Sequence, residues 1–268
     1  MHAPEPDTPH CALATVVATL RAAGCVFAED EARLLVDAAT HPGELARMVE
    51  HRTSGVPLEH VLGWVEFSGV RMEVDAGVFV PRRRSELLVR QAVALLHPGD
   101  VVVDLCCGSG AVGVAVAAAS TGVELHAADV DTAAVRCARR NVESVGGHVH
   151  EGDLFDALPA TLRGRVDVVV TNVPYVPSEA IALMPPEARD HEPQIALDGG
   201  PDGLDFQRAV AAEAPRWLRP GGHLLVETSA HQAATTADIV TRAGLLARIV
   251  RSGELDATAV VGTWRVDY

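Results

Sequence analysis

The chain has 268 residues, a formal net charge of −14 and 48% hydrophobic residues. This length allows one large domain or two smaller ones, and the hydrophobic content is enough to bury a core. The 22 basic residues are all arginine, which excludes chemistry through a lysine Schiff base. The acidic balance disfavours direct nucleic-acid binding, and no apolar run of about 18 residues predicts a membrane span.

The cysteines are scattered and odd in number, a pattern that does not predict a disulfide framework. They are Cys11, Cys25, Cys106, Cys107 and Cys137. The first residues, MHAPEPDTPH, lack a positive region followed by an apolar one, so we expect no signal peptide there. These features together predict a cytoplasmic protein with reduced thiols.

The first part of the chain has helical patterning. Residues 10–53 predict about three helices, the first ending near Gly24 and the third starting near Pro42 and ending before Gly55. Residues 65–82 alternate around Ser68-Gly69 and predict a β-hairpin. We expect a helical domain over 1–62, a hairpin linker over 63–82 and a larger domain over 83–268.

From residue 100 onward, strand-like segments alternate with helix-like ones, which indicates a mainly parallel sheet with helices on both faces. The predicted strands lie within residues 100–106, 123–129, 148–152, 165–172, 223–229, 246–252 and 257–268. The last two are joined only by SGELD, too short for a parallel crossover, so the last strand should be antiparallel. The predicted fold is therefore α/β and Rossmann-like, with seven strands.

The segment DLCCGSGAVG, residues 104–113, joins the first sheet strand to its helix. Gly108 and Gly110 allow tight turning and close approach of the backbone to a ligand, and the following helix N-terminus favours a negatively charged group. Glycines at this spacing are also common in an ordinary strand-to-helix turn. Both interpretations are open on this segment alone.

Acidic residues follow the next two strands. Asp129 ends the second strand, where an acid can bind ribose hydroxyl groups, although Asp131 nearby would serve as well for a helix cap. Asp153 follows the third strand, where it can accept a hydrogen bond from an adenine amino group. The three strand ends together predict a cofactor that contains adenosine.

A dinucleotide site prefers G-x-G-x-x-G, whereas Asp104 and the glycines here resemble the D-x-x-x-G-x-G loop of S-adenosylmethionine-dependent methyltransferases. The resemblance implies S-adenosyl-L-methionine as the cofactor and the corresponding methyltransferase fold. The predicted cofactor-binding residues are Asp104, Cys106, Cys107, Gly108, Ser109, Gly110, Asp129, Asp153, Leu154 and Asn172.

The segment TNVPYVP, residues 171–177, makes the resemblance more specific, because it follows a buried-looking strand. With the segments at 57–82 and 191–208, nearly the whole chain resembles the HemK/PrmC family of protein-glutamine N5-methyltransferases. That family acts on peptide chain release factors. The resemblance implies a release factor as the protein partner and a helical N-terminal domain that helps to dock it. The oligomeric state is not predicted.

The resemblance also implies the catalytic residues Asn172, Val173, Pro174 and Tyr175. An amide nitrogen is a poor nucleophile because its lone pair is delocalised into the carbonyl group. The side-chain oxygen of Asn172 and the carbonyl of Val173 would hold the amide N–H groups, and Tyr175 would pack against the amide plane. The gain is orientation and proximity to the methyl donor.

This sequence departs from the family pattern at three places. Val173 stands where the family has proline, but its backbone carbonyl remains available. Cys106 stands where the family has glycine, so a positive φ is not expected there. In the run 81–86, Arg83 and Arg84 stand where the family has proline and an acid, which suggests a different acceptor. The arginines at 82–84 are compatible with a phosphate-binding patch or with a solvated loop.

Other interpretations remain open. The acceptor can instead be a small-molecule amide or amine or, against the net charge, a nucleic-acid base. A third possibility is a regulatory protein that binds the cofactor without catalysis. No metal site is predicted, since Cys106 and Cys107 have no second pair at zinc spacing and His148 and His150 have no third ligand nearby in sequence.

Overall fold

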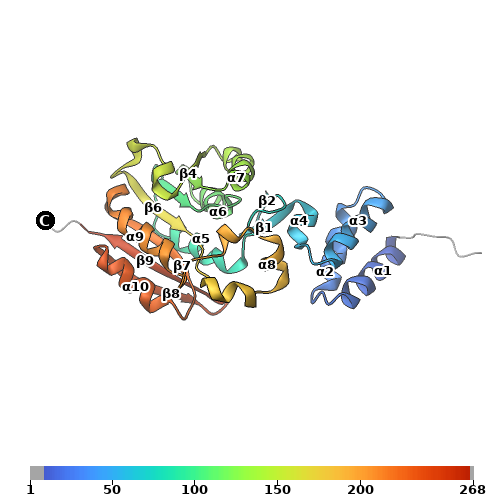
Figure 1. The fold of residues 1–268 in the computed structure, drawn as a ribbon. Coiled ribbons are helices and arrows are strands. Elements are labelled where there is room, and N and C mark those ends of the chain that lie inside the picture. The colour runs from blue at the N-terminus through green and yellow to red at the C-terminus, as the bar shows by residue number, and fades with distance from the viewer. Residues whose placement is uncertain (1–8, 266–268) are drawn as a thin grey trace, which may run out of the picture.

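The computed structural model describes residues 9–265, with side chains from residue 12, and these residues contain a seven-stranded sheet (Figure 1). Its strands are β3 (Val101–Leu105), β4 (Glu124–Asp129), β5 (His148–Glu151), β6 (Val166–Thr171), β7 (Leu218–Thr228), β8 (Leu245–Ser252) and β9 (Ala257–Trp264). Their order across the sheet is β5-β4-β3-β6-β7-β9-β8. Only β9 runs against its neighbours, β7 and β8. The predicted fold class and the antiparallel last strand are therefore confirmed.

The central strands are buried on both faces, which explains their continuous apolar runs. Every residue of β3 and β6 is buried. Side chains alternate between the two faces, so Val168 and Val170 enter one core and Val169 enters the other. Two separate cores thus enclose the sheet.

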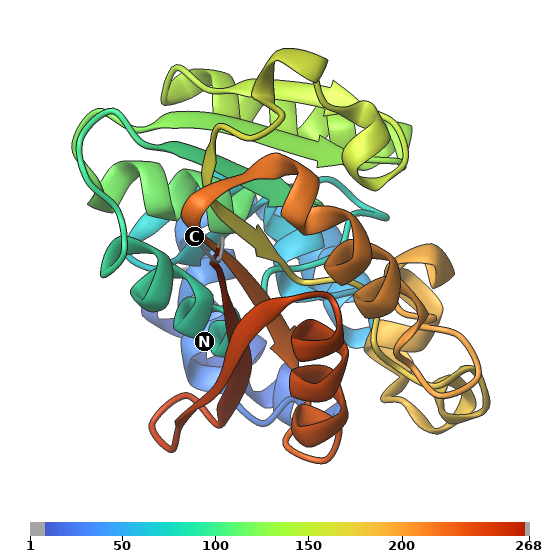
Figure 2. The ribbon, with the colours of Figure 1, turned by 90° about the vertical axis from the view of Figure 1, so that its left-hand side faces the viewer.

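Each core is closed by its own layer of helices (Figure 2). The helices that contribute to the first core are α5 (Glu86–Val93), α6 (Ala111–Ala119) and α7 (Thr132–Ser144). Those of the second core are α9 (Asp205–Trp217) and α10 (Ala233–Arg242). The arrangement is the three-layer α/β architecture in which ligands bind at the carboxyl ends of the strands.

The first part of the chain forms a helical group beyond one end of the sheet (Figure 1). Its helices are α1 (Pro9–Ala22), α2 (Ala28–Ala38), α3 (Pro42–Thr53) and the short α4 (Leu58–Leu62). The group has its own core, which includes Val16, Leu20 and Leu35. The sequence predicted the first three helices, whereas α4 has only five residues and was not predicted.

A hairpin joins the helical group to the sheet, as predicted. Strand β1 (Trp64–Phe67) pairs antiparallel with β2 (Val70–Glu73). Asn141 of α7 ties this hairpin to the loop after β3: its side chain bonds the backbone N–H and C=O of Glu73, at 2.9 and 2.8 Å, and donates to the Ser109 carbonyl at 2.8 Å. The domain boundaries given above remain a proposal.

Between β6 and α9 the chain covers the carboxyl ends of the strands with short helical turns. They are η4 (Ser178–Leu183), α8 (Pro186–His191) and η5 (Gln194–Ala196). Arg52 of the helical group reaches Glu187 of α8 at 3.5 Å, and Arg52 also pairs with the largely buried Glu31 at 2.6 Å. Further 3₁₀ turns are η1 (Arg83–Ser85), η2 (Leu154–Ala157) and η3 (Ala160–Leu162).

The expectation about a signal peptide concerns residues that lie partly outside the described range, since the structure describes nothing before residue 9. The end of the predicted last strand, residues 266–268, also lies outside it. Among residues 9–265, none of the helices is long and apolar enough to cross a membrane.

The close contact between α6 and α7 depends on a glycine. Gly110 precedes α6 with a φ of 79°, and a Cβ atom there would lie 2.7 Å from Cγ2 of the buried Val142. Gly122 has a similar φ of 68° but nothing within 4 Å of such an atom. The two glycines therefore share the conformational constraint and differ in packing.

We expect Gly110→Ala to lower the free energy of unfolding more than Gly122→Ala. The left-handed conformation alone costs an alanine about 1–2 kcal/mol, and overpacking against Val142 adds about 1–3 kcal/mol. Urea denaturation of both variants measures the difference. Equal losses would show that α7 moves aside without cost.

Candidate functional site

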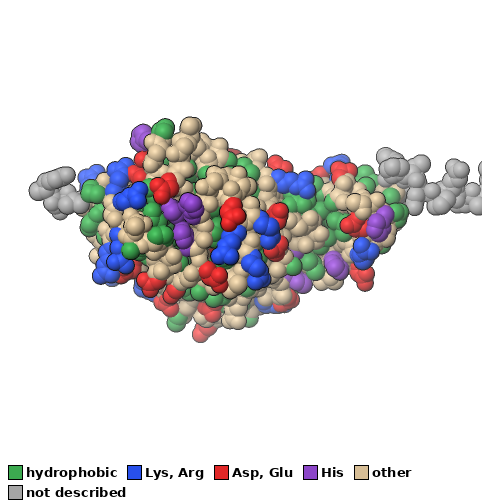
Figure 3. All heavy atoms as spheres, turned by 90° about the horizontal axis from the view of Figure 1, so that it is seen from above, with side chains coloured by type: hydrophobic (Ala, Val, Ile, Leu, Met, Phe, Trp, Pro, Cys, Tyr) green, Lys and Arg blue, Asp and Glu red, His purple; other side chains and the backbone are tan. Residues whose placement is uncertain are grey.

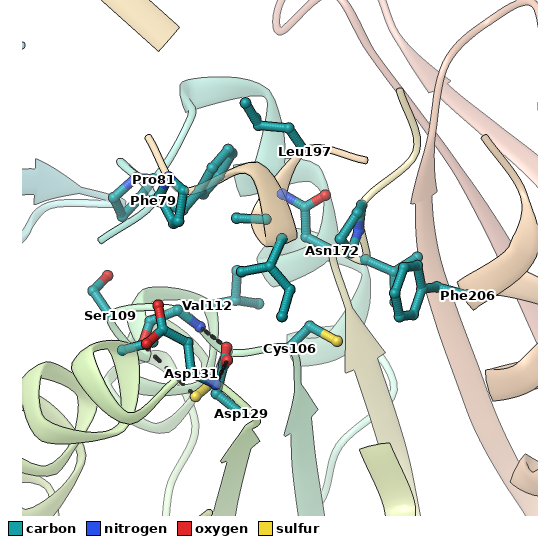
Figure 4. A pocket seen from close by; sticks show the side chains of 18 of the residues that line it. Phe79, Pro81, Cys106, Ser109, Val112, Asp129, Asp131, Asn172, Leu197 and Phe206 are labelled. Carbon is teal, nitrogen blue, oxygen red and sulfur yellow. Dashed lines mark hydrogen bonds between the residues drawn. The ribbon is translucent and has the colours of Figure 1, made fainter. Parts of the chain in front are cut away.

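A cavity of about 390 Å³ lies at the carboxyl ends of β3, β4 and β6 (Figure 4). It is lined by nearly all the residues that the sequence singled out, namely Asp104, Cys106, Cys107, Gly108, Ser109, Asp129, Asp153, Leu154, Asn172, Val173, Pro174 and Tyr175. Gly110 does not line it. Its place is at the start of α6, where it permits the close packing described above. The structure thus brings together the two motifs, whose nearest ends, residues 113 and 171, are 58 positions apart in sequence.

The backbone turns sharply out of β3 at Cys106. Its φ is 54°, so the expectation that cysteine would exclude a positive φ is wrong. The left-handed conformation costs about 1–2 kcal/mol. It is retained because Cys106 packs against the second core while the N–H of Cys107 bonds the Ala128 carbonyl of β4 at 3.1 Å. These tertiary contacts of Cys106 and Cys107 outweigh the preference of a cysteine for a negative φ.

The environment of the two thiols in this loop, Cys106 and Cys107, disfavours the reactive thiolate form. Burial raises the pKa of Cys106 and that of Cys107, and the nearby carboxylates of Asp104 and Asp129 raise both further. Both side chains therefore stay neutral and act as small packing groups. Within residues 9–265, no group of three or more His, Cys, Asp or Glu side chains is arranged to hold a metal ion.

Asp129 braces the glycine loop from the end of β4. One carboxylate oxygen accepts from the Gly108 N–H at 2.8 Å, and the other accepts from the Asp131 N–H at 2.9 Å. Asp131, by contrast, caps α7 by accepting from the Ala133 N–H at 2.8 Å. Asp131 thus caps a helix, whereas Asp129 supports the glycine loop and has its carboxylate fixed at the cavity wall. Burial raises its pKa.

Asp104 and Ser109 are the two buried polar residues of the loop after β3. The buried Asp104 carboxylate accepts from the Gly113 N–H at 2.8 Å, and burial raises its pKa to about 7. The Ser109 hydroxyl is buried and has no hydrogen-bond partner among the described residues. An orphaned hydroxyl beside the cavity is a polar group that a ligand would satisfy.

The third strand end adds Asp153 and Leu154. The N–H of Gly152 bonds the Asp129 carbonyl at 3.0 Å, which draws this turn toward the cavity. Leu154 has a φ of 44°, a second left-handed residue other than glycine at the cavity wall. Strained backbone of this kind gathers at ligand sites.

The end of β6 forms the opposite side of the cavity, and Figure 4 shows Asn172 well separated from Asp129 and Asp131. Val173 lines the cavity but is only 1% exposed and packs into the second core, so the substitution for proline is accommodated by core packing. The amide nitrogen of Asn172 donates to the Ser85 hydroxyl at 3.3 Å. The Tyr175 hydroxyl donates to Glu227 at 3.3 Å, and burial raises the pKa of Tyr175 to about 12.

Two arginines of the 82–84 loop, Arg82 and Arg84, are engaged in ion pairs. Arg82 donates to both oxygens of the buried Glu192 at 2.6 Å. Arg84 donates through Nε to Glu227 at 3.3 Å, and its guanidinium lies 5.9 Å from the Tyr175 ring centre. Arg82 and Arg84 thus neutralise buried acids, whereas Arg83 is exposed to solvent.

Sequence reasoning did not assign several residues of the cavity wall. Phe79 and Pro81 lie within the quoted hairpin segment, and Leu197 lies within the quoted 191–208 segment, but no role was given to them. Ser85 and Glu192 lie within the segments 81–86 and 191–208 but were given no role, and Glu227 was missed because a single polar residue carries no motif. The fold places Ser85 on the cavity wall and ties Glu192 and Glu227 to the wall residues Arg82, Arg84 and Tyr175.

The comparisons with known proteins agree with this geometry. Residues 70–184 match the family model described as methyltransferase small domain. The release factor glutamine methyltransferase of Geobacter sulfurreducens is 37% identical, over 78% of this chain and 74% of that protein. The 4-amino-L-phenylalanine/4-methylamino-L-phenylalanine methyltransferase of Streptomyces pristinaespiralis is 36% identical, over 76% of this chain and 71% of that protein.

Among solved structures, a methyltransferase from Pyrococcus furiosus has a TM-score of 0.56 at 17% identity. The match covers 74% of this chain and 90% of that one, and it supports the methyltransferase fold alone. The sequence relatives are closer and cover most of both chains. On their evidence, this chain is a methyltransferase and belongs to the release factor glutamine methyltransferase family.

Proposed function

We propose that the protein transfers a methyl group from S-adenosyl-L-methionine to the side-chain amide of a glutamine in a peptide chain release factor. The observation that carries this proposal is one cavity that joins the braced glycine loop to the Asn172–Tyr175 segment. The relatives named release factor glutamine methyltransferase support the choice of acceptor.

The residues of the loop side fit S-adenosylmethionine. The cavity volume lies in the range of small-molecule sites. Its wall offers the orphaned Ser109 hydroxyl, the fixed Asp129 carboxylate for ribose hydroxyls and Asp153 for an adenine amino group. When bound, the cofactor supplies an electrophilic methyl group. The protein orients it and excludes water.

The residues of the β6 side fit a planar amide. The Asn172 oxygen and the Val173 carbonyl are acceptors, suited to the two N–H groups of a primary amide, and the Tyr175 ring offers a flat apolar surface. Held in this way, the amide nitrogen faces the methyl donor. S-adenosylmethionine would supply the methyl group and leave as S-adenosylhomocysteine, and the surplus proton of the amide nitrogen would go to solvent.

A protein acceptor is also favoured by the surroundings of the cavity. Ile195 of η5 lines the cavity and is 51% exposed, and Leu183 of η4 is 86% exposed. Single exposed apolar side chains are ordinary on protein surfaces, so it is the position of these two at or near the cavity that suggests a contact site. We propose that these residues and the helical group of residues 9–62 dock the release factor. In Figure 3, acidic and basic side chains alternate over the visible face without a broad basic patch, which disfavours a nucleic-acid acceptor.

One observation favours a second candidate function. The Streptomyces pristinaespiralis relative is named for an aromatic amine, 4-amino-L-phenylalanine, rather than for a protein. The cavity of this chain carries Arg84 where the family has an acid, so an acceptor of different charge is compatible with it. An N-methyltransferase of a small amine is therefore the alternative to be tested.

The test is to incubate the purified protein and methyl-labelled cofactor with release factors or with 4-amino-L-phenylalanine. We expect label on a single glutamine of a release factor, located by mass spectrometry. Asn172→Ala should lower the rate by about 100-fold, the usual cost of losing one positioning contact. Label on the aromatic amine alone would replace the proposal by the alternative.

A second prediction separates the two acids at the loop. We expect Asp129→Asn to weaken binding of S-adenosylhomocysteine by about 10-fold to 100-fold, because a charged hydrogen bond contributes about 1.5–3 kcal/mol. Asp131→Asn is the matched control and should change the affinity by less than about threefold, since asparagine caps helices as well as aspartate does. Isothermal titration calorimetry measures both.

The ribose assignment of Asp129 would be contradicted by the reverse order, with Asp131→Asn the more damaging change. Circular dichroism of both variants verifies that the loss is one of binding and not of folding.

A further inference from the structure

Behind the acceptor side of the cavity lies a buried carboxylate, Glu227, near the end of β7. Its side chain is only 3% exposed. It accepts from the Tyr175 hydroxyl at 3.3 Å and from Arg84 Nε at 3.3 Å. Its other oxygen, Oε2, is buried without a hydrogen-bond partner in the described part of the chain. A buried carboxylate with an unused acceptor atom is costly unless it has a function.

Ser85 connects this carboxylate to Asn172. The Ser85 hydroxyl accepts from the Asn172 amide nitrogen at 3.3 Å, and Ser85 itself is 2% exposed. Having accepted there, the hydroxyl has one proton left to donate. Glu227, whose Oε2 has no partner among the described residues, is a nearby acceptor: burial raises the pKa of Glu227, and the Ser85 hydroxyl lowers it.

The direction of this chain of hydrogen bonds determines how the Asn172 amide is turned. The Asn172 amide nitrogen donates to the Ser85 oxygen at 3.3 Å, and this direction leaves the single Ser85 proton free for a carboxylate, which only accepts. An accepting partner selects the NH₂ end of the amide. The oxygen end of Asn172 is then left for the cavity, where the acceptor amide needs a hydrogen-bond acceptor.

We infer that Glu227 and Ser85 are positioning residues, which lock the Asn172 side chain with its oxygen toward the methyl acceptor. The Tyr175 hydroxyl donates to the same carboxylate. Glu227 therefore positions Tyr175 directly and Asn172 through Ser85. Arg84 neutralises the charge from the other side of the cavity wall. This inference rests on the proposed function for its chemical consequence, but the orientation itself does not depend on the acceptor.

Nuclear magnetic resonance tests the orientation directly, because the sequence contains only two asparagines, Asn141 and Asn172. Protein labelled with ¹⁵N-asparagine therefore gives two side-chain NH₂ groups, and Asn172→Ala identifies one of them. Asn141 donates to the backbone carbonyls of Glu73 and Ser109, with no hydrogen bond to Ser85, and serves as the internal control.

We expect Ser85→Ala to shift the Asn172 NH₂ signals and to speed their exchange with solvent at least about tenfold, because the amide loses its acceptor. Glu227→Gln should act in the same direction. Ser85→Thr retains the hydroxyl and should restore the wild-type signals. The Asn141 signals should not change in any of these variants.

The kinetic consequence is a lower kcat with an unchanged KM for the cofactor in Ser85→Ala, and recovery in Ser85→Thr. Unchanged Asn172 signals in Ser85→Ala would overturn the inference. So would a simultaneous loss of the Asn141 signals, which would indicate general unfolding. If no acceptor is methylated at all, the proposed function fails while the spectra still decide the orientation.

Discussion

The site depends on the pairing of β3 with β6. Leu105 is the register partner of Thr171, and the Thr171 hydroxyl donates to the Leu105 carbonyl at 2.9 Å. Because parallel strands end at the same edge, this register places Cys106 and Asn172, the next residues of each strand, side by side. A slip of one residue would turn every buried side chain of β6 to the other face, so the two cores enforce the alignment.

Sequence patterns predicted most of this arrangement, because they report local constraints. Strand–helix alternation gave the sheet, and the short SGELD connection gave the antiparallel β9. The motif at 104–113 and the segment at 171–177 were correctly expected near one another, since both follow strands. What sequence did not predict was long-range polar contact. Ser85, Glu192 and Glu227 are single residues whose partners lie 52 to 143 positions away.

Cys106 illustrates the limit of local rules. A cysteine normally avoids a positive φ, and on that basis the loop was expected to differ from the glycine-containing family pattern. The fold holds the residue there because its side chain has a place in the second core and the following N–H has a partner on β4. Val173, which replaces a proline of the family pattern, is accommodated in a similar way. Its side chain packs in the second core, and its backbone still offers a carbonyl acceptor.

Charge is distributed around the cavity so that buried acids and arginines cancel in pairs. Glu192 with Arg82 supports the hairpin side, and Glu227 with Arg84 supports the motif side. The cavity itself is left with the carboxyl groups of Asp104, Asp129, Asp131 and Asp153 on the loop side and with neutral amide and carbonyl acceptors on the β6 side. That asymmetry suits a positively charged methyl donor beside a neutral amide.

The most direct measurement is a crystal structure with S-adenosylhomocysteine and a glutamine-containing peptide bound. The account predicts the glutamine amide nitrogen within hydrogen-bond distance of both the Asn172 side-chain oxygen and the Val173 carbonyl, with the cofactor ribose at Asp129. A glutamine bound elsewhere, or an Asn172 amide turned with its nitrogen toward the peptide, would contradict it.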